Sequence, residues 1–137
     1  MRIAGVAAER SLRDSIERGC RLRGHDVVVA RDLEELAERN APPCTGVITE
    51  LPIPGDDVTP ADLRRLTPNA FRAALVLRQD TLDRDDTAYF MFVMEYQEFA
   101  EGQAPMLQAM EYFAARTPKK RAALAADGVE TISEDAD

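Results

Sequence analysis

Few residues in this sequence could do acid–base, nucleophilic or phosphate chemistry, and they do not form a catalytic set. The single histidine, His25, lies at a predicted helix-to-strand turn, where neither a Ser/His/Asp nor a Cys/His arrangement can form. The turn over residues 7–10 reads Ala-Ala-Glu-Arg and is not a glycine-rich phosphate loop. One carboxylate stands out by its place, because Glu50 directly follows the short apolar segment 46–49. These residue types predict no enzyme, no cofactor and no metal, and they single out Glu50.

Short apolar segments that alternate with amphipathic ones would position Glu50. Strands are predicted at residues 3–6, 27–30, 46–49 and 73–77. Helices are predicted over residues 11–23 and from starts at Asp32, Pro60 and Pro105, with Asp32 and Thr59 in capping positions. Such alternation predicts a doubly wound α/β fold, a parallel sheet covered by helices on both faces. In that fold the functional site lies where the strands end, which is where Glu50 falls.

The segment from residue 87 to residue 99 is apolar on every side, so its periodicity does not separate helix from strand. We favour a helix over residues 87–96, followed by a short strand at 98–101; the alternative is a strand here and a lost or shortened helix before it. Aromatic and methionine side chains are enriched at interface cores, so the segment is also the candidate surface for a protein partner or a homodimer. The candidate interface residues are Tyr89, Phe90, Phe92, Met94, Tyr96 and Phe99.

The length and composition of the chain limit its domain number and the classes of partner it can have. A chain of 137 residues suits one domain, which we place at residues 1–116, followed by an acidic tail, 117–137, that we expect to be mobile. The net charge of −8 argues against nucleic acid or an anionic membrane as the main partner. The start has no signal-peptide pattern, which predicts a cytoplasmic protein. Cys20 and Cys44 are predicted to be buried free thiols, and the acidic stretch 80–86 a solvated linker without metal.

Five segments resemble a response-regulator receiver domain, the CheY-like fold with a five-stranded parallel sheet. They are residues 2–6, 11–13, 22–27, 30–36 and 46–55, the last reading GVITELPIPG. The last segment looks like the receiver's third strand, phospho-acceptor and Pro-Gly turn, with Glu50 at the acceptor position. The resemblance covers residues 1–57 well and extends to Leu77. It implies a two-component signalling role in which Mg²⁺ helps to transfer a phosphoryl group to the acceptor.

The residues that hold Mg²⁺ in receivers are mostly replaced in this chain. Where receivers carry two acidic residues after the first strand, this chain has Ala7 and Ala8, which cannot ligate a metal. Glu9 follows one residue late, as a remnant of the acidic pocket. The acceptor position holds Glu50 instead of Asp, which moves the carboxylate outward.

The two positions that bind the phosphate in receivers also hold different residues in this chain. Arg78 stands where a receiver has Ser or Thr after the fourth strand, and the best alignment places Glu101 at the position of the receiver's Lys. From these departures we predict a degenerate pseudo-receiver, a domain that binds a protein partner without being phosphorylated. In this hypothesis Glu50 mimics the phosphorylated state and forms an ion pair with Arg78.

Two alternatives stay open. In the first, Glu9 and an aspartate of the turn at residues 55–57 rebuild a metal site, and the chain is a diverged receiver that is still phosphorylated. In the second, less favoured, the chain is a small α/β enzyme.

Overall fold

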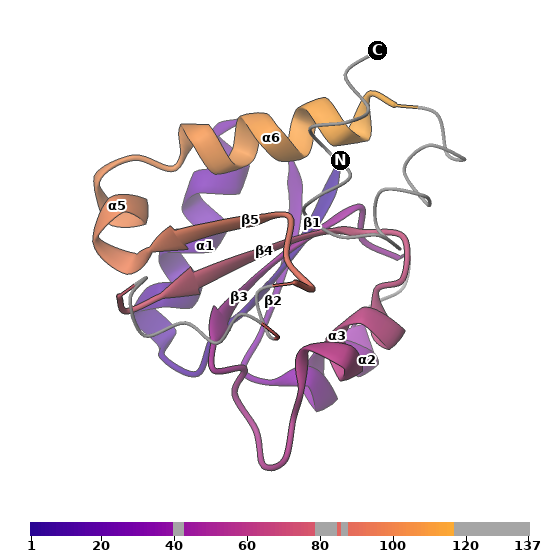
Figure 1. Cartoon of the computed structure of the whole chain (residues 1–137). Helices are drawn as coiled ribbons and strands as arrows, with labels where there is room; N and C mark the ends of the chain where they lie inside the picture. Colours follow the sequence, from indigo (N-terminus) through magenta and orange to yellow (C-terminus); the bar gives the residue numbers. More distant parts are fainter. Residues whose placement is uncertain (40–42, 79–84, 86–87, 117–137) are drawn as a thin grey trace.

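The computed structural model describes residues 1–39, 43–78, 85 and 88–116, and in them the chain forms one five-stranded parallel sheet (Figure 1). The strand order is β2-β1-β3-β4-β5, with every neighbouring pair parallel. The strands are β1 (Arg2–Val6), β2 (Asp26–Ala30), β3 (Gly46–Leu51), β4 (Phe71–Val76) and β5 (Phe92–Glu95). All five strands therefore end at one side of the sheet, which we call the carboxyl edge. The predicted fold class is confirmed.

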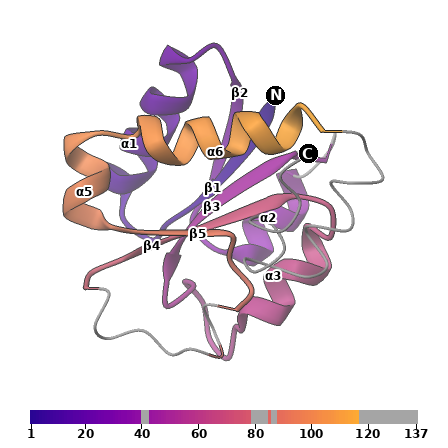
Figure 2. The ribbon, with the colours of Figure 1, turned by 45° about the horizontal axis from the view of Figure 1, so that its top comes forward.

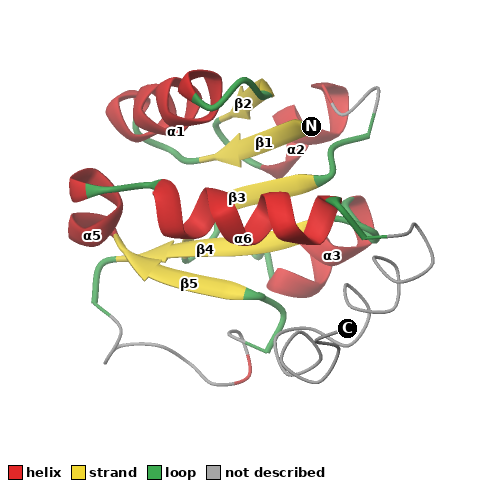
Figure 3. Ribbon diagram, turned by 90° about the horizontal axis from the view of Figure 1, so that it is seen from above, coloured by secondary structure: helices red, strands yellow, loops and turns green. Residues whose placement is uncertain are grey.

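Helices cover both faces of the sheet (Figure 2). Helices α1 (Arg10–Leu22) and α6 (Ala104–Ala114) pack on one face. Helices α2 (Leu33–Arg39) and α3 (Pro60–Leu66) pack on the other. The short helix α5 (Tyr96–Glu101) follows β5 directly and leads into α6 (Figure 3). The sheet thus has a separate apolar core on each face, as a doubly wound fold requires.

Local sequence signals account for two of the helix starts. Asp32 caps α2, because its Oδ1 accepts a hydrogen bond of 2.9 Å from the Glu35 N–H. Thr59 caps α3 in a reciprocal capping box with Asp62. Helix α1 begins at Arg10, one residue before its predicted start, and the side chain of the preceding Glu9 makes no capping hydrogen bond.

Helix α1 turns one apolar stripe towards the sheet. Ile16, Gly19 and Cys20 are buried, and Leu12 packs against the same core. Helix α6 likewise buries four apolar side chains, which are Met106, Leu107, Met110 and Phe113.

The prediction for residues 87–101 is wrong. Residues 92–95 form β5, which pairs with β4 in the register Ala73↔Phe92, and residues 96–101 are helical. This is the alternative in which the segment is a strand. The Glu98 carboxylate accepts a hydrogen bond from the Glu95 N–H, a helix-start contact between two glutamates that ends the strand and begins α5. Most of the stretch 80–86 and all of the tail 117–137 lie outside the described residues.

No helix in the described part of the chain is long and apolar enough to cross a membrane.

Candidate functional site at the carboxyl edge

Glu50, near the end of β3, joins three segments of the chain at the carboxyl edge. Its Oε1 accepts a hydrogen bond of 2.7 Å from the N–H of Ala8, in the loop that follows β1. Its Oε2 accepts a hydrogen bond of 3.0 Å from the hydroxyl of Tyr96, the first residue after β5. Because β1 and β5 lie on opposite sides of β3 in the sheet, this one carboxylate links both halves of the edge.

Tyr96 is half-buried, and its hydroxyl donates a hydrogen bond to Glu50. Burial, followed by the hydrogen bond to the Glu50 carboxylate, raises the pKa of this hydroxyl above its usual value. The hydroxyl therefore stays protonated at neutral pH and keeps donating to Glu50. Both carboxylate oxygens of Glu50 thus have a protein donor.

The loop after β1 holds a positive charge where the resemblance would place acidic side chains. The Nη1 group of Arg13 donates hydrogen bonds to the carbonyl oxygens of Ala7, at 2.9 Å, and of Ala8, at 2.7 Å. Ala7 is buried, whereas Glu9 is exposed. Across the described residues, no three His, Cys, Asp or Glu side chains gather into a possible metal site.

Two further predicted site residues, Arg78 and Glu101, are exposed. Arg78 is exposed beyond the end of β4. Ala8 and Tyr96 donate hydrogen bonds to the Glu50 carboxylate, and the ion pair between Glu50 and Arg78 stays a prediction. Glu101 is exposed at the far end of α5, because the strand that was expected to end there ends at Glu95 instead.

The candidate interface residues divide into two groups. Phe90, Met94 and Phe99 are buried and belong to the core, so they cannot form a contact surface. Tyr89, Phe92 and Tyr96 are half-buried. Of the six, only the three half-buried side chains are therefore within reach of a partner.

The other side chains that could react, Cys20, Cys44 and His25, are buried or hydrogen-bonded away from Glu50. Burial raises the pKa of the Cys20 thiol to about 12 and that of Cys44 to about 11, and both are free and buried as predicted. His25 lies 2.7 Å from Glu111 through its Nε2 atom and joins the turn before β2 to α6. None of these three residues lies beside Glu50 in a set that could act as nucleophile and base.

Neither the protein-family models nor the curated proteins contain a match to this sequence. Solved structures do match. A CheY-like receiver domain from Methylobacillus flagellatus superposes with a TM-score of 0.67 at 15% identity, covering 80% of this chain and 98% of that one. The fold is that of a receiver domain.

Two further structures with this receiver fold show how widely it is used. The response regulator TrrA from Thermotoga maritima, solved in complex with Mg²⁺ and BeF, matches with a TM-score of 0.65 at 16% identity, over 80% of this chain and 97% of that one. A protein named adenylate cyclase from Rhodopirellula baltica matches with a TM-score of 0.58 at 16% identity, over 85% and 98%. At such identities the likeness establishes the receiver fold and leaves function to the site.

Sequence reasoning missed two residues of this site. Tyr96 was assigned to an interface, and its place beside Glu50 became visible only once β5 was known to end at Glu95. Arg13 was not among the candidate site residues, although its position one turn into α1 puts it within reach of the preceding loop.

Proposed function

We propose that this chain is a receiver-fold signalling domain that acts through protein contacts, without Mg²⁺-dependent phosphorylation of Glu50. The receiver fold supports a role in two-component signalling. One observation carries the rest of the proposal: Ala8 and Tyr96 engage both oxygens of the Glu50 carboxylate.

Phosphoryl transfer to a carboxylate needs an oxygen that can attack and a cation that neutralises the phosphate. Here Tyr96 donates to Oε2, which lowers the electron density available for attack. Mg²⁺ prefers several carboxylate, carbonyl and water oxygens. The Ala7 and Ala8 carbonyls already accept from the Arg13 guanidinium, whose positive charge repels a metal ion. These groups do not fit a Mg²⁺ site.

The contact between Glu50 and Tyr96 supports a fixed signalling state. It ties the end of β3 to the start of α5 and holds a carboxylate at the carboxyl edge. In switching proteins a new phosphate orders such a segment through contacts of the same kind. We infer that Glu50 and Tyr96 hold the junction of β5 and α5 in one conformation.

The surface beside β5 and α6 is suited to a protein partner. A hollow of about 120 Å³ opens between them, lined mainly by apolar groups of Phe92, Phe113 and their neighbours, with Tyr112 at its side 56% exposed. Tyr112 and Phe92 are aromatic types enriched at interface cores. A second copy of the chain is one partner that this surface could accept.

Intact-mass spectrometry after incubation with Mg²⁺ and acetyl phosphate tests the proposal. We expect no phosphoryl adduct on this chain under conditions that modify the Thermotoga maritima response regulator, which serves as the positive control. An adduct on Glu50 would instead establish a diverged receiver that is still phosphorylated. Light scattering over a concentration series would then detect a homodimer, which Tyr112→Glu should weaken if the dimer uses the surface beside α6.

A further inference from the structure

The hollow of about 120 Å³ beside α6 lies at the amino ends of β4 and β5. Phe71 and Phe92 are the first residues of these two strands, and both line the hollow together with Met91. Glu50 and Tyr96 lie at the opposite, carboxyl ends of the strands. The hollow is therefore separate from the carboxyl edge.

Helix α6 and the residues after it form the other wall of the hollow. Ala109, Tyr112 and Phe113 line it from the helix, and Arg116 lines it from two residues beyond the helix end. The Phe113 ring packs edge-on against Phe71, with 5.5 Å between the ring centroids and 67° between the ring planes. Both of these rings are buried in the core. The floor of the hollow is thus formed before a ligand arrives, which reduces the entropy cost of binding.

The size and the lining of the hollow suit one aromatic ring. An apolar cavity of about 150 Å³ is large enough to bind benzene, and this hollow is of similar size. Phenylalanine rings pack favourably edge to face with another ring, and a methionine sulfur makes favourable contacts at a ring edge. Phe92 and Ala109 are half-buried and Tyr112 is exposed, so the hollow is open to solvent on their side.

Arg116 brings a positive charge to this apolar hollow. Its Nη2 group donates a hydrogen bond of 2.6 Å to the Tyr112 hydroxyl, and its guanidinium carbon lies 4.5 Å from the centre of the Tyr112 ring. These two contacts hold the guanidinium beside the hollow, and its planar fork of N–H donors matches a carboxylate. The carboxylate of the neighbouring Glu111 is bound by Arg23 and His25, neither of which lines the hollow.

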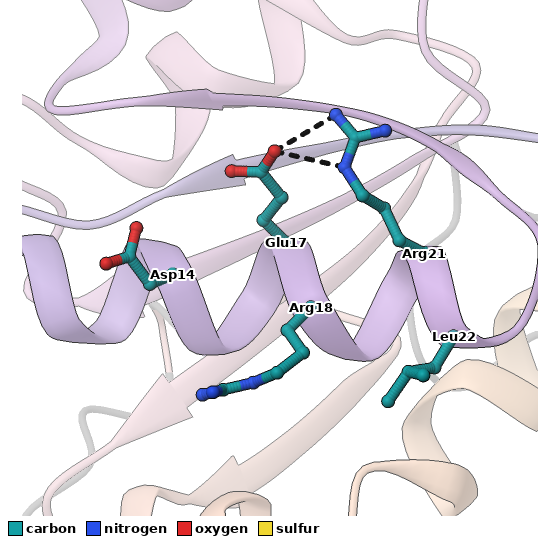
Figure 4. A pocket seen from close by; sticks show the side chains of 5 residues that line it. All are labelled: Asp14, Glu17, Arg18, Arg21 and Leu22. Carbon is teal, nitrogen blue, oxygen red and sulfur yellow. Dashed lines mark hydrogen bonds and ion pairs between the residues drawn. The ribbon is translucent and has the colours of Figure 1, made fainter.

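The larger hollow along α1, of about 490 Å³, is less suited to an aromatic ring (Figure 4). Its five lining residues all lie on that one helix, and four of them are charged. Two of these four, Glu17 and Arg21, pair with each other at 3.0 Å. A ring placed there would contact Leu22 and otherwise charged groups.

We propose that the hollow between β5 and α6 binds a small aromatic carboxylate, with its ring against Phe92 and Phe113 and its carboxylate on Arg116. The apolar lining selects the ring, and the guanidinium selects the acid. The inference goes beyond the proposed function, which gives the same face to a protein partner. It does not rest on that function, because ligand binding is measured on the chain alone.

The probes are four small molecules, titrated into the ¹⁵N-labelled full chain at concentrations at which light scattering shows a monomer. Benzoate carries a ring and a carboxylate, benzyl alcohol only the ring, acetate only the carboxylate, and benzylamine a ring with a positive charge. We expect saturable amide shifts at Met91, Phe92 and Ala109 with benzoate, with a Kd on the order of 1 mM. Benzyl alcohol should bind about tenfold more weakly, and acetate and benzylamine should give no saturable shift at these residues.

Matched variants test the two halves of the ligand separately. Arg116→Gln should weaken benzoate binding about tenfold and leave benzyl alcohol binding within about twofold of the parent chain. Ala109→Leu fills the hollow and should abolish the binding of both probes. Arg18→Gln removes an exposed arginine from α1, and Ala115→Leu enlarges an exposed alanine just after α6. Neither control residue lines the hollow, so both variants should bind benzoate within about twofold of the parent chain.

Four results would overturn the proposal. They are the lack of a saturable shift at Met91 and Phe92 with benzoate, equal losses in Arg116→Gln and Arg18→Gln, benzoate binding retained in Ala109→Leu, and benzylamine binding as tight as that of benzoate. None of these results bears on phosphorylation at Glu50, so this inference and the proposed function can fail separately.

Discussion

Removing the Tyr96 hydroxyl is the sharpest perturbation of the carboxyl edge. Tyr96→Phe keeps the ring and deletes the donor that lies 3.0 Å from Glu50 Oε2. A hydrogen bond to a charged group contributes about 1.5–3 kcal/mol to stability. Because both side chains are half-buried, water can replace part of the contact, so we expect a loss at or just below the low end of this range, about 1–1.5 kcal/mol in the free energy of unfolding.

Urea unfolding at pH 7, followed by circular dichroism, measures this loss, and the m-value should not change. Tyr89→Phe is the matched control. Tyr89 is also half-buried, but its hydroxyl makes no hydrogen bond to any residue that the structure describes, so its loss should cost less than about 0.5 kcal/mol.

A double-mutant cycle separates the contact from other effects of the substitution. Glu50→Ala removes the acceptor, and combining it with Tyr96→Phe should give a coupling energy of about 1 kcal/mol. A coupling energy under about 0.3 kcal/mol, or equal losses in Tyr96→Phe and Tyr89→Phe, would refute the assignment of Tyr96 as the partner of Glu50.

Three further predictions concern the rest of the fold. Hydrogen bonds from Arg23 hold the pKa of Glu111 at about 2, below its usual value. The stability that this carboxylate contributes should therefore be present above about pH 4.5 and be lost as the pH falls towards 2. Urea unfolding of Glu111→Gln should show a flatter pH dependence of the unfolding free energy between these two pH values. Gly5→Ala should destabilise the chain by about 1–3 kcal/mol, because the new Cβ would lie 2.7 Å from Cγ2 of buried Ile16 and lift α1 off β1. Thr59→Ala should cost about 1 kcal/mol in thermal or urea unfolding, since it removes the α3 cap.

Each of these predictions has an outcome or a control that can contradict it. For Glu111→Gln, a slope between pH 4.5 and 2 equal to that of the parent chain would contradict the linkage to Arg23. Gly102→Ala introduces a Cβ with nothing within 4 Å, so an equal loss there would show that close packing is not the cause at Gly5. Thr59→Ser retains a capping hydroxyl and should recover most of the stability.

The first half of the fold could be predicted from the sequence because its signals are local. Apolar runs bounded by caps, such as Asp32 before α2 and Thr59 before α3, specify strands and helix starts within a few residues of their observed places. The parallel sheet then follows from the alternation of elements, and with it the place of Glu50 at the carboxyl edge.

The rest could not be predicted, because it depends on contacts between segments far apart in the chain. β5 has only four residues and lies in an aromatic run without usable periodicity, so its limits are set by pairing with β4. Tyr96 reaches Glu50 across 46 positions of sequence. The pairing of Arg78 with Glu50 rests only on loops that follow neighbouring strands, and proximity of loops does not fix where an exposed side chain points.

The amide resonances of Ala8 and Tyr96 test the central claim most directly. The Ala8 amide itself donates to the Glu50 carboxylate, and the Tyr96 amide belongs to the residue whose hydroxyl does so. We would record ¹H–¹⁵N spectra of the full chain with and without Mg²⁺ and beryllofluoride, beside the Thermotoga maritima response regulator as a positive control. We predict no shift at either residue while the control responds. Saturable shifts centred on Ala8, Glu50 and Tyr96 would contradict the account and show that the carboxyl edge still binds metal and phosphate.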